Sequence, residues 1–139
     1  MRATLTRSVT FSAAHRYRRP EWDDARNAEV FGACAHPHWH GHTYTCEVTV
    51  GGEVDPVTGF CADLGALDRA LAERVVGRLD HRNLVLDIPE FHEGRLIPTS
   101  ENVATWIARE VQAALGATTR VLRVRLAEMP GLWVEIEPT

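Results

Sequence analysis

Histidine is concentrated in one short stretch of the chain. Seven histidines occur among 139 residues, and His36, His38, His40 and His42 alternate with other residues in a single segment. One glycine separates His40 from His42, so on a β-strand both imidazoles project from the same side of the sheet. Neutral imidazole is a frequent zinc ligand. The pattern predicts metal binding by His40 and His42, with a polar surface loop as the alternative, and assigns no role to His36 or His38.

A third nitrogen is expected from His15. Between Thr4 and His15 the odd positions are mostly apolar and the even positions mostly Thr or Ser, a period of two that is typical of a β-strand. His15 ends this strand on its apolar side. If the strand neighbours the one that carries His40 and His42, the three imidazoles can share one ion. Three protein nitrogens with a free fourth position are typical of catalytic zinc, whereas structural sites are closed by four ligands.

Two further features are suited to proton transfer. Cys34 precedes His40 among small and loop-forming residues, so we expect an accessible thiol that acts as a base or a nucleophile once a nearby cation or metal lowers its pKa. An inert loop cysteine is the alternative. Asp80 and His81 are adjacent, and a carboxylate can orient an imidazole and stabilise its charged form. Bracing of a loop is the alternative for this pair.

Glu128 is a carboxylate on an apolar face. It shares the parity of Leu122, Val124 and Leu126, and an inward carboxylate needs partners because an unpaired buried charge is costly. The paired N–H donors of an amino-pyrimidine ring would bind it in a bidentate manner. A frayed strand end with Glu128 in water is the alternative. Glu101 is expected in the first turn of a helix, where it either complements the helix dipole or faces a ligand.

Periodicity and turn residues predict the elements that position these groups. We expect strands over residues 4–15, 40–50, 120–128 and 132–136, and a loop or short helix over 16–32. Helices are expected to start near Asp63 and at 98–101, and Gly116 is expected to end the second. Their inner faces are predicted to be Leu64, Leu67, Leu71 and Val75, and Val103, Ile107, Val111 and Leu115.

The order of these elements indicates the fold class. Strand, strand, helix, helix, strand, strand predicts an α+β fold in one domain spanning residues 1–139: a four-stranded antiparallel sheet with two helices packed on one face. The open face of so small a sheet is expected to need a partner subunit.

Composition argues against several classes of protein. A net charge of −4, from 15 basic and 19 acidic side chains without a basic run, argues against nucleic-acid binding through phosphates. No apolar stretch approaches the roughly 20 residues that span a membrane, and the first residues lack the apolar core of a signal peptide. Three cysteines without a Cys-x-x-Cys pair argue against a disulfide framework and favour the cytoplasm.

Together these segments resemble the 6-pyruvoyl-tetrahydropterin synthase family, which includes the 6-carboxy-tetrahydropterin synthases. The resemblance covers nearly the whole chain, and its motifs occur in the family's order. They are Phe11-Ser12-Ala13-Ala14-His15-Arg16, Cys34 followed by His40-Gly41-His42, Asp55-Pro56-Val57-Thr58-Gly59, Leu79-Asp80-His81-Arg82-Asn83-Leu84, Pro98-Thr99-Ser100-Glu101-Asn102, and Glu128.

The resemblance implies a tunnelling fold, in which subunits join their sheets into a barrel, and a homohexamer built as a dimer of trimers. It implies Zn²⁺ on His15, His40 and His42. The residues it implies for proton transfer are Cys34, Asp80 and His81. The residues it implies for substrate binding are Glu128, which would anchor the pterin ring, and Thr99, Ser100 and Glu101.

The implied activity is that of a zinc-dependent lyase of tetrahydropterin biosynthesis. Its substrate is 7,8-dihydroneopterin triphosphate, from which it eliminates triphosphate to give 6-pyruvoyl-tetrahydropterin. A 6-carboxy-tetrahydropterin synthase of the queuosine (7-deazapurine) pathway, releasing acetaldehyde and triphosphate, is the alternative within the family. A three-histidine zinc hydrolase and a non-enzymatic metal-binding oligomeric module are the alternatives outside it. Arg16, Arg82 and Arg95 are unranked candidates for holding the triphosphate.

Overall fold

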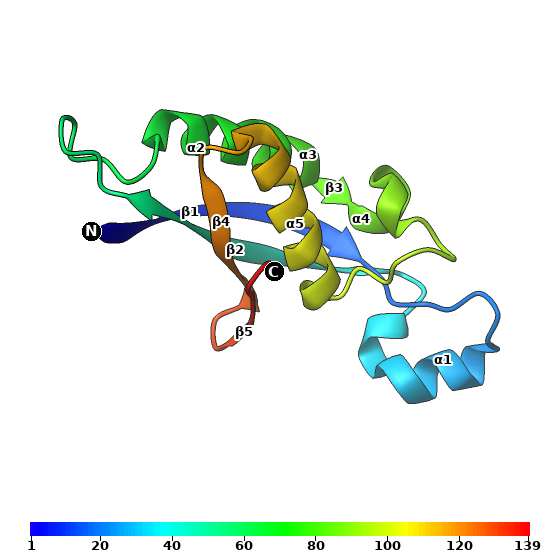
Figure 1. The fold of residues 1–139 in the computed structure, drawn as a ribbon. Coiled ribbons are helices and arrows are strands. Elements are labelled where there is room, and N and C mark those ends of the chain that lie inside the picture. The colour runs from blue at the N-terminus through cyan, green and yellow to red at the C-terminus, as the bar shows by residue number, and fades with distance from the viewer.

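Five strands form one sheet in the order β3–β1–β2–β4–β5, and helices cover one of its faces (Figure 1). The computed structural model describes every residue, 1–139. The strands are β1 (Arg2–His15), β2 (His40–Glu53), β3 (Arg82–Asn83), β4 (Arg120–Met129) and β5 (Leu132–Ile136). The helical segments are α1 (Asp24–Phe31), η1 (Gly32–Ala35), α2 (Leu64–Ala70), η2 (Leu71–Val76), α3 (Gly77–Leu79), α4 (Leu84–Asp87), η3 (Pro89–Phe91) and α5 (Ser100–Leu115). The α+β class and the four long strands are as predicted.

The sheet has a fifth strand and is mixed rather than purely antiparallel. β3 is two residues long and runs parallel to β1, so the prediction of a four-stranded antiparallel sheet is wrong at this edge. The turn before β3 is fastened to β1, because the Ser12 N–H donates to Asp80 Oδ1 at 2.8 Å and the His81 N–H donates to the Ser12 carbonyl at 2.6 Å. A strand this short has no alternation to detect in the sequence.

β1 and β2 pair along their full length in antiparallel register, with His15 opposite His40. The two strands are therefore neighbours, which is the condition for a shared ion. β2 continues past its expected end at Val50 through Gly51 and Gly52. A Cβ at Gly51 would lie 2.7 Å from Leu122 Cδ1, so glycine lets β4 approach β2 closely at this point.

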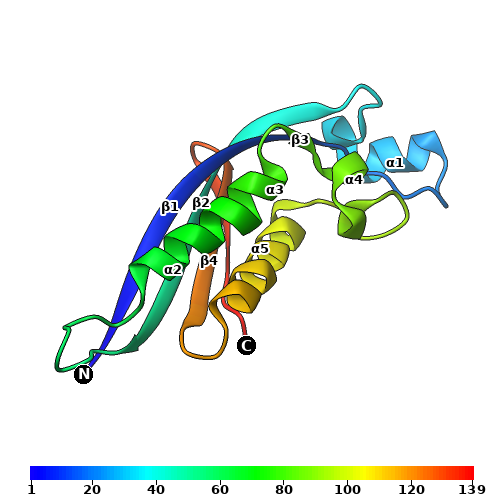
Figure 2. The same cartoon turned by 90° about the horizontal axis from the view of Figure 1, so that it is seen from above.

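Two helical rods lie side by side over one face of the sheet (Figure 2). The first begins after Asp63, whose side chain accepts the Ala66 N–H at 3.0 Å, and runs from α2 through the π-helical η2 into α3. The second, α5, begins after its cap Thr99 and ends at Gly116, which has a φ of 69°. Both predicted starts and the predicted end are confirmed.

The predicted inner faces of the two rods are buried, with one exception. The buried members are Leu67, Leu71, Val75, Val103, Ile107 and Val111, and Leu115 is half-buried. The prediction for Leu64 is wrong, because this first residue of α2 is 41% exposed and borders a surface hollow with Phe60 and Thr118.

β4 alternates as predicted near its end but not at its start. Val124 and Leu126 are buried, whereas Leu122 is half-buried and Val121 takes the inward position. The prediction for Leu122 is wrong because the pairing of β4 with β2 shifts by one residue where β2 reaches Val50. Such a shift moves the following side chains to the other face.

Residues 16–32, expected to form a loop or a short helix, contain α1. Asp23 caps this helix by accepting the Arg26 N–H at 2.8 Å. Buried Asn27 fastens the preceding loop, because its side chain accepts the Arg19 N–H at 2.8 Å and donates to the Arg19 carbonyl at 3.0 Å. In Figures 1 and 2, α1 lies beyond the end of the sheet, near the start of β2.

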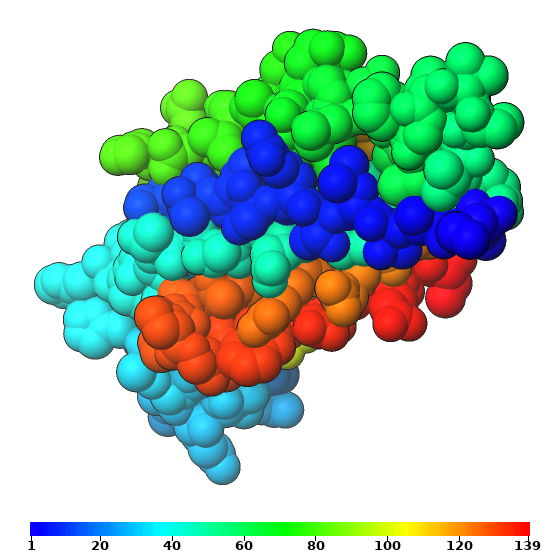
Figure 3. All heavy atoms as spheres, turned by 90° about the vertical axis from the view of Figure 1, so that its left-hand side faces the viewer, coloured from blue at the N-terminus to red at the C-terminus, as the bar shows by residue number.

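The other face of the sheet carries no helix. In Figure 3, β1, β2, β4 and β5 cross this face as successive blue, teal, orange and red bands. Hydroxyl pairs link β1 to β2 on this side, with Thr6 2.7 Å from Thr49 and Ser12 3.0 Å from Thr43. This uncovered face is the one expected to need a partner subunit.

None of the helices is both long enough and apolar enough to cross a membrane. All three cysteines, Cys34, Cys46 and Cys61, are free thiols. The cytoplasmic location stays a prediction.

Candidate metal centre and active site

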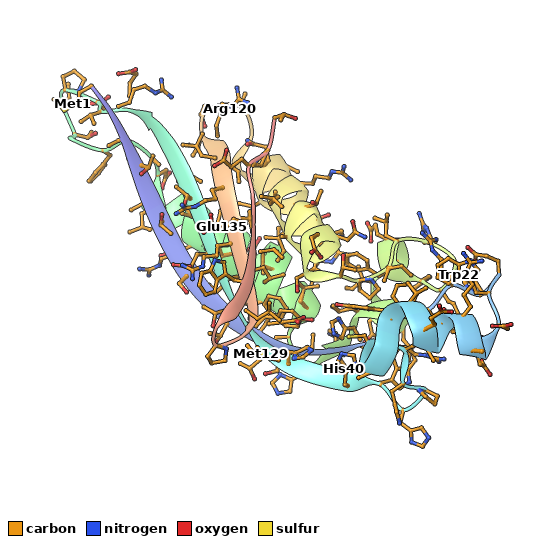
Figure 4. All side chains as sticks on the ribbon, turned by 90° about the horizontal axis from the view of Figure 1, so that it is seen from below. Met1, Trp22, His40, Arg120, Met129 and Glu135 are labelled. Atoms are coloured by element: carbon orange, nitrogen blue, oxygen red, sulfur yellow. The ribbon has the colours of Figure 1, made fainter.

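Three histidines from the ends of β1 and β2 meet at one point. His15, His40 and His42 each offer a ring nitrogen, and these nitrogens lie within 4.8 Å of one another. The register explains the cluster, because His15 is opposite His40 and His42 follows two residues later on the same face. Figure 4 shows His40 at the end of the sheet near α1. The three ligands predicted from the sequence are brought together.

The proton on His15 leaves one ring nitrogen available for a metal ion. Nδ1 lies 3.0 Å from the Pro98 carbonyl oxygen and 3.1 Å from the Tyr44 hydroxyl. A carbonyl oxygen only accepts, so Nδ1 carries the proton and Nε2 keeps its lone pair. Nε2 is buried and has no hydrogen-bond partner. Because an unsatisfied buried nitrogen is costly, the donor set fits a metal ion.

Burial keeps these imidazoles in the form that binds metals. His15 is completely buried, and desolvation followed by the charge of His40 lowers its pKa from 6.5 to about 4. Desolvation, followed by the charge of His42, also lowers the pKa of His40. Lowered pKa values mean that both rings stay neutral at pH 7, and only a neutral ring coordinates a metal.

Glu128 lies beside the histidine cluster on the helix-bearing face. Its Oε2 accepts a hydrogen bond from Ser100 Oγ at 3.1 Å and lies 3.9 Å from His42 Nε2. The side chain is only 17% exposed. The alternation of β4 predicts this orientation, and Ser100 supplies a partner that an inward carboxylate needs.

The predicted substrate residues at the start of α5 differ in what their side chains contact. The Thr99 hydroxyl accepts the Asn102 N–H at 3.2 Å and so caps the helix. Ser100 is buried and donates to Glu128. Glu101 is exposed in the first turn. Ser100 is therefore the one of the three with a direct contact to another predicted site residue.

Cys34 is half-buried in η1, the turn between α1 and β2. Its carbonyl accepts the Tyr17 N–H at 2.8 Å, which fastens the turn just beyond His15. Burial, followed by the Glu128 carboxylate, raises the pKa of the thiol. Burial and Glu128 thus favour the neutral thiol, against the expected activation of Cys34 as a base or a nucleophile. A cation at the histidine cluster would act in the opposite direction and lower the pKa of the thiol.

Asp80 and His81 contact each other and are not part of the three-histidine group. Asp80 Oδ2 is 3.0 Å from His81 Nδ1, and the Ser12 N–H followed by the His81 side chain lowers the pKa of Asp80. The His81 side chain is 84% exposed. The hollow that His81 borders is lined by Ser12, Ala14, Gly41 and Thr43 among others. Alternation points those four residues to the uncovered face of the sheet. Ala13 and His42 line the same hollow, so the pair lies beside β1 with one histidine of the cluster at the same hollow.

The remaining predicted residues fall into separate places. His36 and His38 are exposed in the turn before β2, outside the cluster. Arg16 and Arg95 border one small hollow with Pro98, and the buried Arg16 Nε has no partner. Arg82 borders the hollow with His81 on the uncovered face.

Two tyrosines at the site were missed by the sequence analysis. Tyr44 contacts His15 Nδ1, and its parity with His40 and His42 on β2 is a signal that could have found it. The Tyr17 ring lies 4.9 Å from the His15 ring between centroids. Tyr17 follows the end of β1, where alternation no longer applies, so no periodic signal points to it.

The sequence and the fold of this chain are similar to those of known proteins. Residues 4–139 match the sequence profile of the family described as 6-pyruvoyl tetrahydropterin synthase. The chain belongs to this family. It is 40% identical over 128 residues to the 6-pyruvoyl tetrahydrobiopterin synthase of Drosophila melanogaster, covering 92% of this chain and 75% of that protein. It is 31% identical over 139 residues to the dihydroneopterin monophosphate aldolase of Pyrococcus furiosus, covering 99% of each.

The structure of Caenorhabditis elegans 6-pyruvoyl tetrahydropterin synthase superposes on this one with a TM-score of 0.92 at 33% identity, covering 100% of this chain and 97% of that one. The subunit fold expected from the resemblance is thus confirmed, and the joining of sheets into a barrel stays a prediction. As a member of the 6-pyruvoyl tetrahydropterin synthase family the chain is a lyase. The three-histidine group found here is consistent with the metal site of this family.

Proposed function

We propose that the chain converts 7,8-dihydroneopterin triphosphate to 6-pyruvoyl-tetrahydropterin with elimination of triphosphate. The observation that carries this proposal is the histidine cluster, together with the membership of this chain in the family. In the cluster, the buried Nε2 of His15 lies close to the imidazoles of His40 and His42. Zn²⁺ is the proposed ion, because three protein nitrogens with one free position are typical of catalytic zinc. When bound, zinc would polarise the side-chain oxygens of the substrate and acidify the neighbouring C–H groups.

Glu128 is proposed to hold the pterin ring. Ser100 occupies one of its oxygens, at 3.1 Å, and leaves acceptor capacity for the N–H donors of the amino-pyrimidine edge. With Glu128 at 3.9 Å from His42 Nε2, the ring anchor and the metal ligands border the same space. Thr99 and Glu101 flank Ser100 at the start of α5 and are proposed to complete the binding surface.

Cys34 is proposed to take the carbon-bound proton of the substrate. Its turn is held next to His15 through Tyr17, whose N–H donates to the Cys34 carbonyl and whose ring packs on the His15 ring. Positive charge at the cluster would offset the effect of burial and of Glu128 on the thiol pKa. A proton acceptor works best when its pKa lies near the working pH.

Asp80 and His81 are proposed to relay protons at the site of a neighbouring copy. His81 is exposed and borders a hollow with Ser12, Ala14, Gly41 and Thr43, which alternation points to the uncovered face. A partner that covers this face would bring the pair of one copy toward the histidines of another. The proposed assembly is the homohexamer, a dimer of trimers, that the resemblance implies.

The decisive experiment is incubation of zinc-loaded protein with dihydroneopterin triphosphate, followed by mass identification of the pterin product. A 6-pyruvoyl product with released triphosphate is expected. Acetaldehyde and a 6-carboxy product would instead support the queuosine-pathway alternative. Dihydroneopterin, which has lost the phosphates but keeps the hydroxylated side chain and is heavier than the 6-pyruvoyl product by one water, would point to hydrolysis, and recovery of unchanged substrate would contradict the proposal.

A further inference from the structure

Tyr17 connects the metal ligands to the cysteine turn. Its ring packs edge-on against His15, with centroids 4.9 Å apart and planes at 72°, and lies 6.5 Å from the His40 ring. On its other side it meets Phe31 at 5.9 Å. Its backbone N–H donates to the Cys34 carbonyl at 2.8 Å. The residue is thus held from three sides in one orientation beside the cluster.

The Tyr17 side chain lies next to residues already assigned to the metal and to proton transfer. Its ring packs against His15, and its backbone N–H donates to the turn that contains Cys34. The hydroxyl makes no hydrogen bond within the chain, whereas the Tyr44 hydroxyl contacts His15 Nδ1 at 3.1 Å. A phenol O–H can donate a hydrogen bond, so the unpaired Tyr17 hydroxyl is available to an acceptor oxygen of a ligand.

We propose that Tyr17 contacts the substrate directly, its hydroxyl donating a hydrogen bond to an oxygen of the polyhydroxylated side chain that extends from the pterin ring to the three histidines. This inference rests on the proposed function, since it assumes a ligand at the cluster. A hydroxyl oxygen of that side chain carries negative charge when its own O–H proton leaves. A fixed donor in a site that excludes water stabilises that charge more than water would. The ring meanwhile shields the His15 side of the cluster from solvent.

Tyr17→Phe removes the hydroxyl and keeps the ring, so it tests the donor alone. We expect zinc content and unfolding midpoint to match those of the unmodified protein, kcat to fall about 100-fold, and KM to change less. Phe31→Leu is the matched control, because it loosens the packing of Tyr17 and keeps the hydroxyl. Its kcat is expected to stay within about threefold of the unmodified protein. A Tyr17→Phe variant with unchanged kcat, or one that loses no more than Phe31→Leu, would overturn the inference.

A binding measurement separates this inference from the proposed reaction. Zinc-loaded protein is titrated with dihydroneopterin and with 6-methyl-dihydropterin, which has the same ring without the hydroxyls. Tyr17→Phe is expected to weaken dihydroneopterin about 3- to 10-fold and to leave 6-methyl-dihydropterin unchanged. Equal effects on both ligands would overturn the Tyr17 contact while leaving the proposed function standing. Should the unmodified protein bind neither pterin, the proposed function and the contact would both be wrong.

Discussion

The proposed role of His15 as a metal ligand depends on contacts that hold its other ring nitrogen, Nδ1, in place. The Pro98 carbonyl and the Tyr44 hydroxyl contact Nδ1 at 3.0 and 3.1 Å and set the ring so that Nε2 faces the other histidines. Contacts of this kind orient a ligand and raise its basicity, and their loss typically lowers metal affinity 10- to 100-fold.

Tyr44→Phe is therefore expected to weaken zinc binding about 10-fold. The substituted ring can keep its stacking on Phe11, now at 4.8 Å between centroids, so the fold should be preserved. Affinity is measured by competition with a chromogenic chelator. Thr45→Val, on the opposite face of β2, serves as the control. Equal zinc affinity in the two variants would contradict this role of Tyr44.

The pKa of His15 predicts how the stability of the chelator-treated protein depends on pH. The folded value is about 4 and the ordinary value is 6.5, so between these values the unfolded chain binds a proton that the folded chain does not. Stability should fall as pH drops from 6.5 to 4, by up to about 3 kcal/mol. Asp55 and Asp80, whose pKa values are lowered from 3.8, add losses at lower pH.

Urea unfolding at pH 7, 5.5 and 4.5 in the presence of chelator measures this effect. His15→Gln has no group that titrates in this range and should show a flatter profile between pH 6.5 and 4. Parallel profiles for the two proteins would show that the burial of His15 does not carry the pH dependence.

Glu128→Gln distinguishes a ring anchor from a metal ligand. The amide keeps the size of the side chain and loses the charge that favours paired N–H donors, so we expect KM to rise at least about 10-fold with zinc affinity unchanged. Steady-state kinetics and zinc titration provide the two measurements. Glu47→Gln, whose carboxylate pairs with Arg125 at 3.5 Å on the other face, is the control. Weakened zinc binding with an unchanged KM would assign Glu128 to the metal instead.

At the scale of elements, the start of α5 organises much of the site. Pro98 orients His15, Thr99 caps the helix, and Ser100 holds Glu128. Three consecutive residues therefore connect the helix to the metal cluster and to the proposed ring anchor. The cap determines where the helix begins, and so where the other two residues lie.

Thr99→Ala is expected to destabilise the protein by about 1 kcal/mol through loss of the cap, and Thr99→Ser is expected to restore most of that stability. Urea unfolding measures the change. Thr105→Ala removes a threonine inside the same helix, whose hydroxyl donates to the Glu101 carbonyl at 2.9 Å, and should change stability little. If Thr99→Ala and Thr105→Ala lowered the free energy of unfolding by the same small amount, capping would not explain the role of Thr99.

At the scale of the whole molecule, the proposed proton-transfer groups come from elements far apart in the sequence. Cys34 lies in η1 before β2, whereas His81 borders a hollow beside β1 and β3. In the proposed assembly a complete site would draw on two copies of the chain, so that activity would depend on assembly.

Mixing two inactive variants tests this dependence. Cys34→Ala and His81→Ala should each lose turnover and keep zinc. Mixed, unfolded and refolded together in equal amounts, they should regain roughly a quarter of the unmodified activity, because random assembly joins an intact Cys34 to an intact His81 of another copy at that frequency. Separate refolding followed by mixing without exchange is the control. If the mixed oligomer recovered no activity, Cys34 and His81 would have to act together in the site of a single chain.

The sequence by itself determined what depends on local pattern. Alternation located β1, β2 and β5, polar caps located the starts of α2 and α5, and parity placed His40, His42 and Glu128 on one face. These features follow from side-chain direction along a single element, which a sequence displays directly.

Tertiary structure decided what depends on contacts between elements. The register of β1 against β2 put His15 opposite His40, a shift in the pairing of β2 with β4 exchanged Val121 for Leu122, and β3 joined the edge of β1. Only the folded chain showed that Tyr17 flanks the cluster and that His81 borders a hollow at the ends of β1 and β2. Long-range pairing and loop paths have no local period, because they are settled by which surfaces pack together.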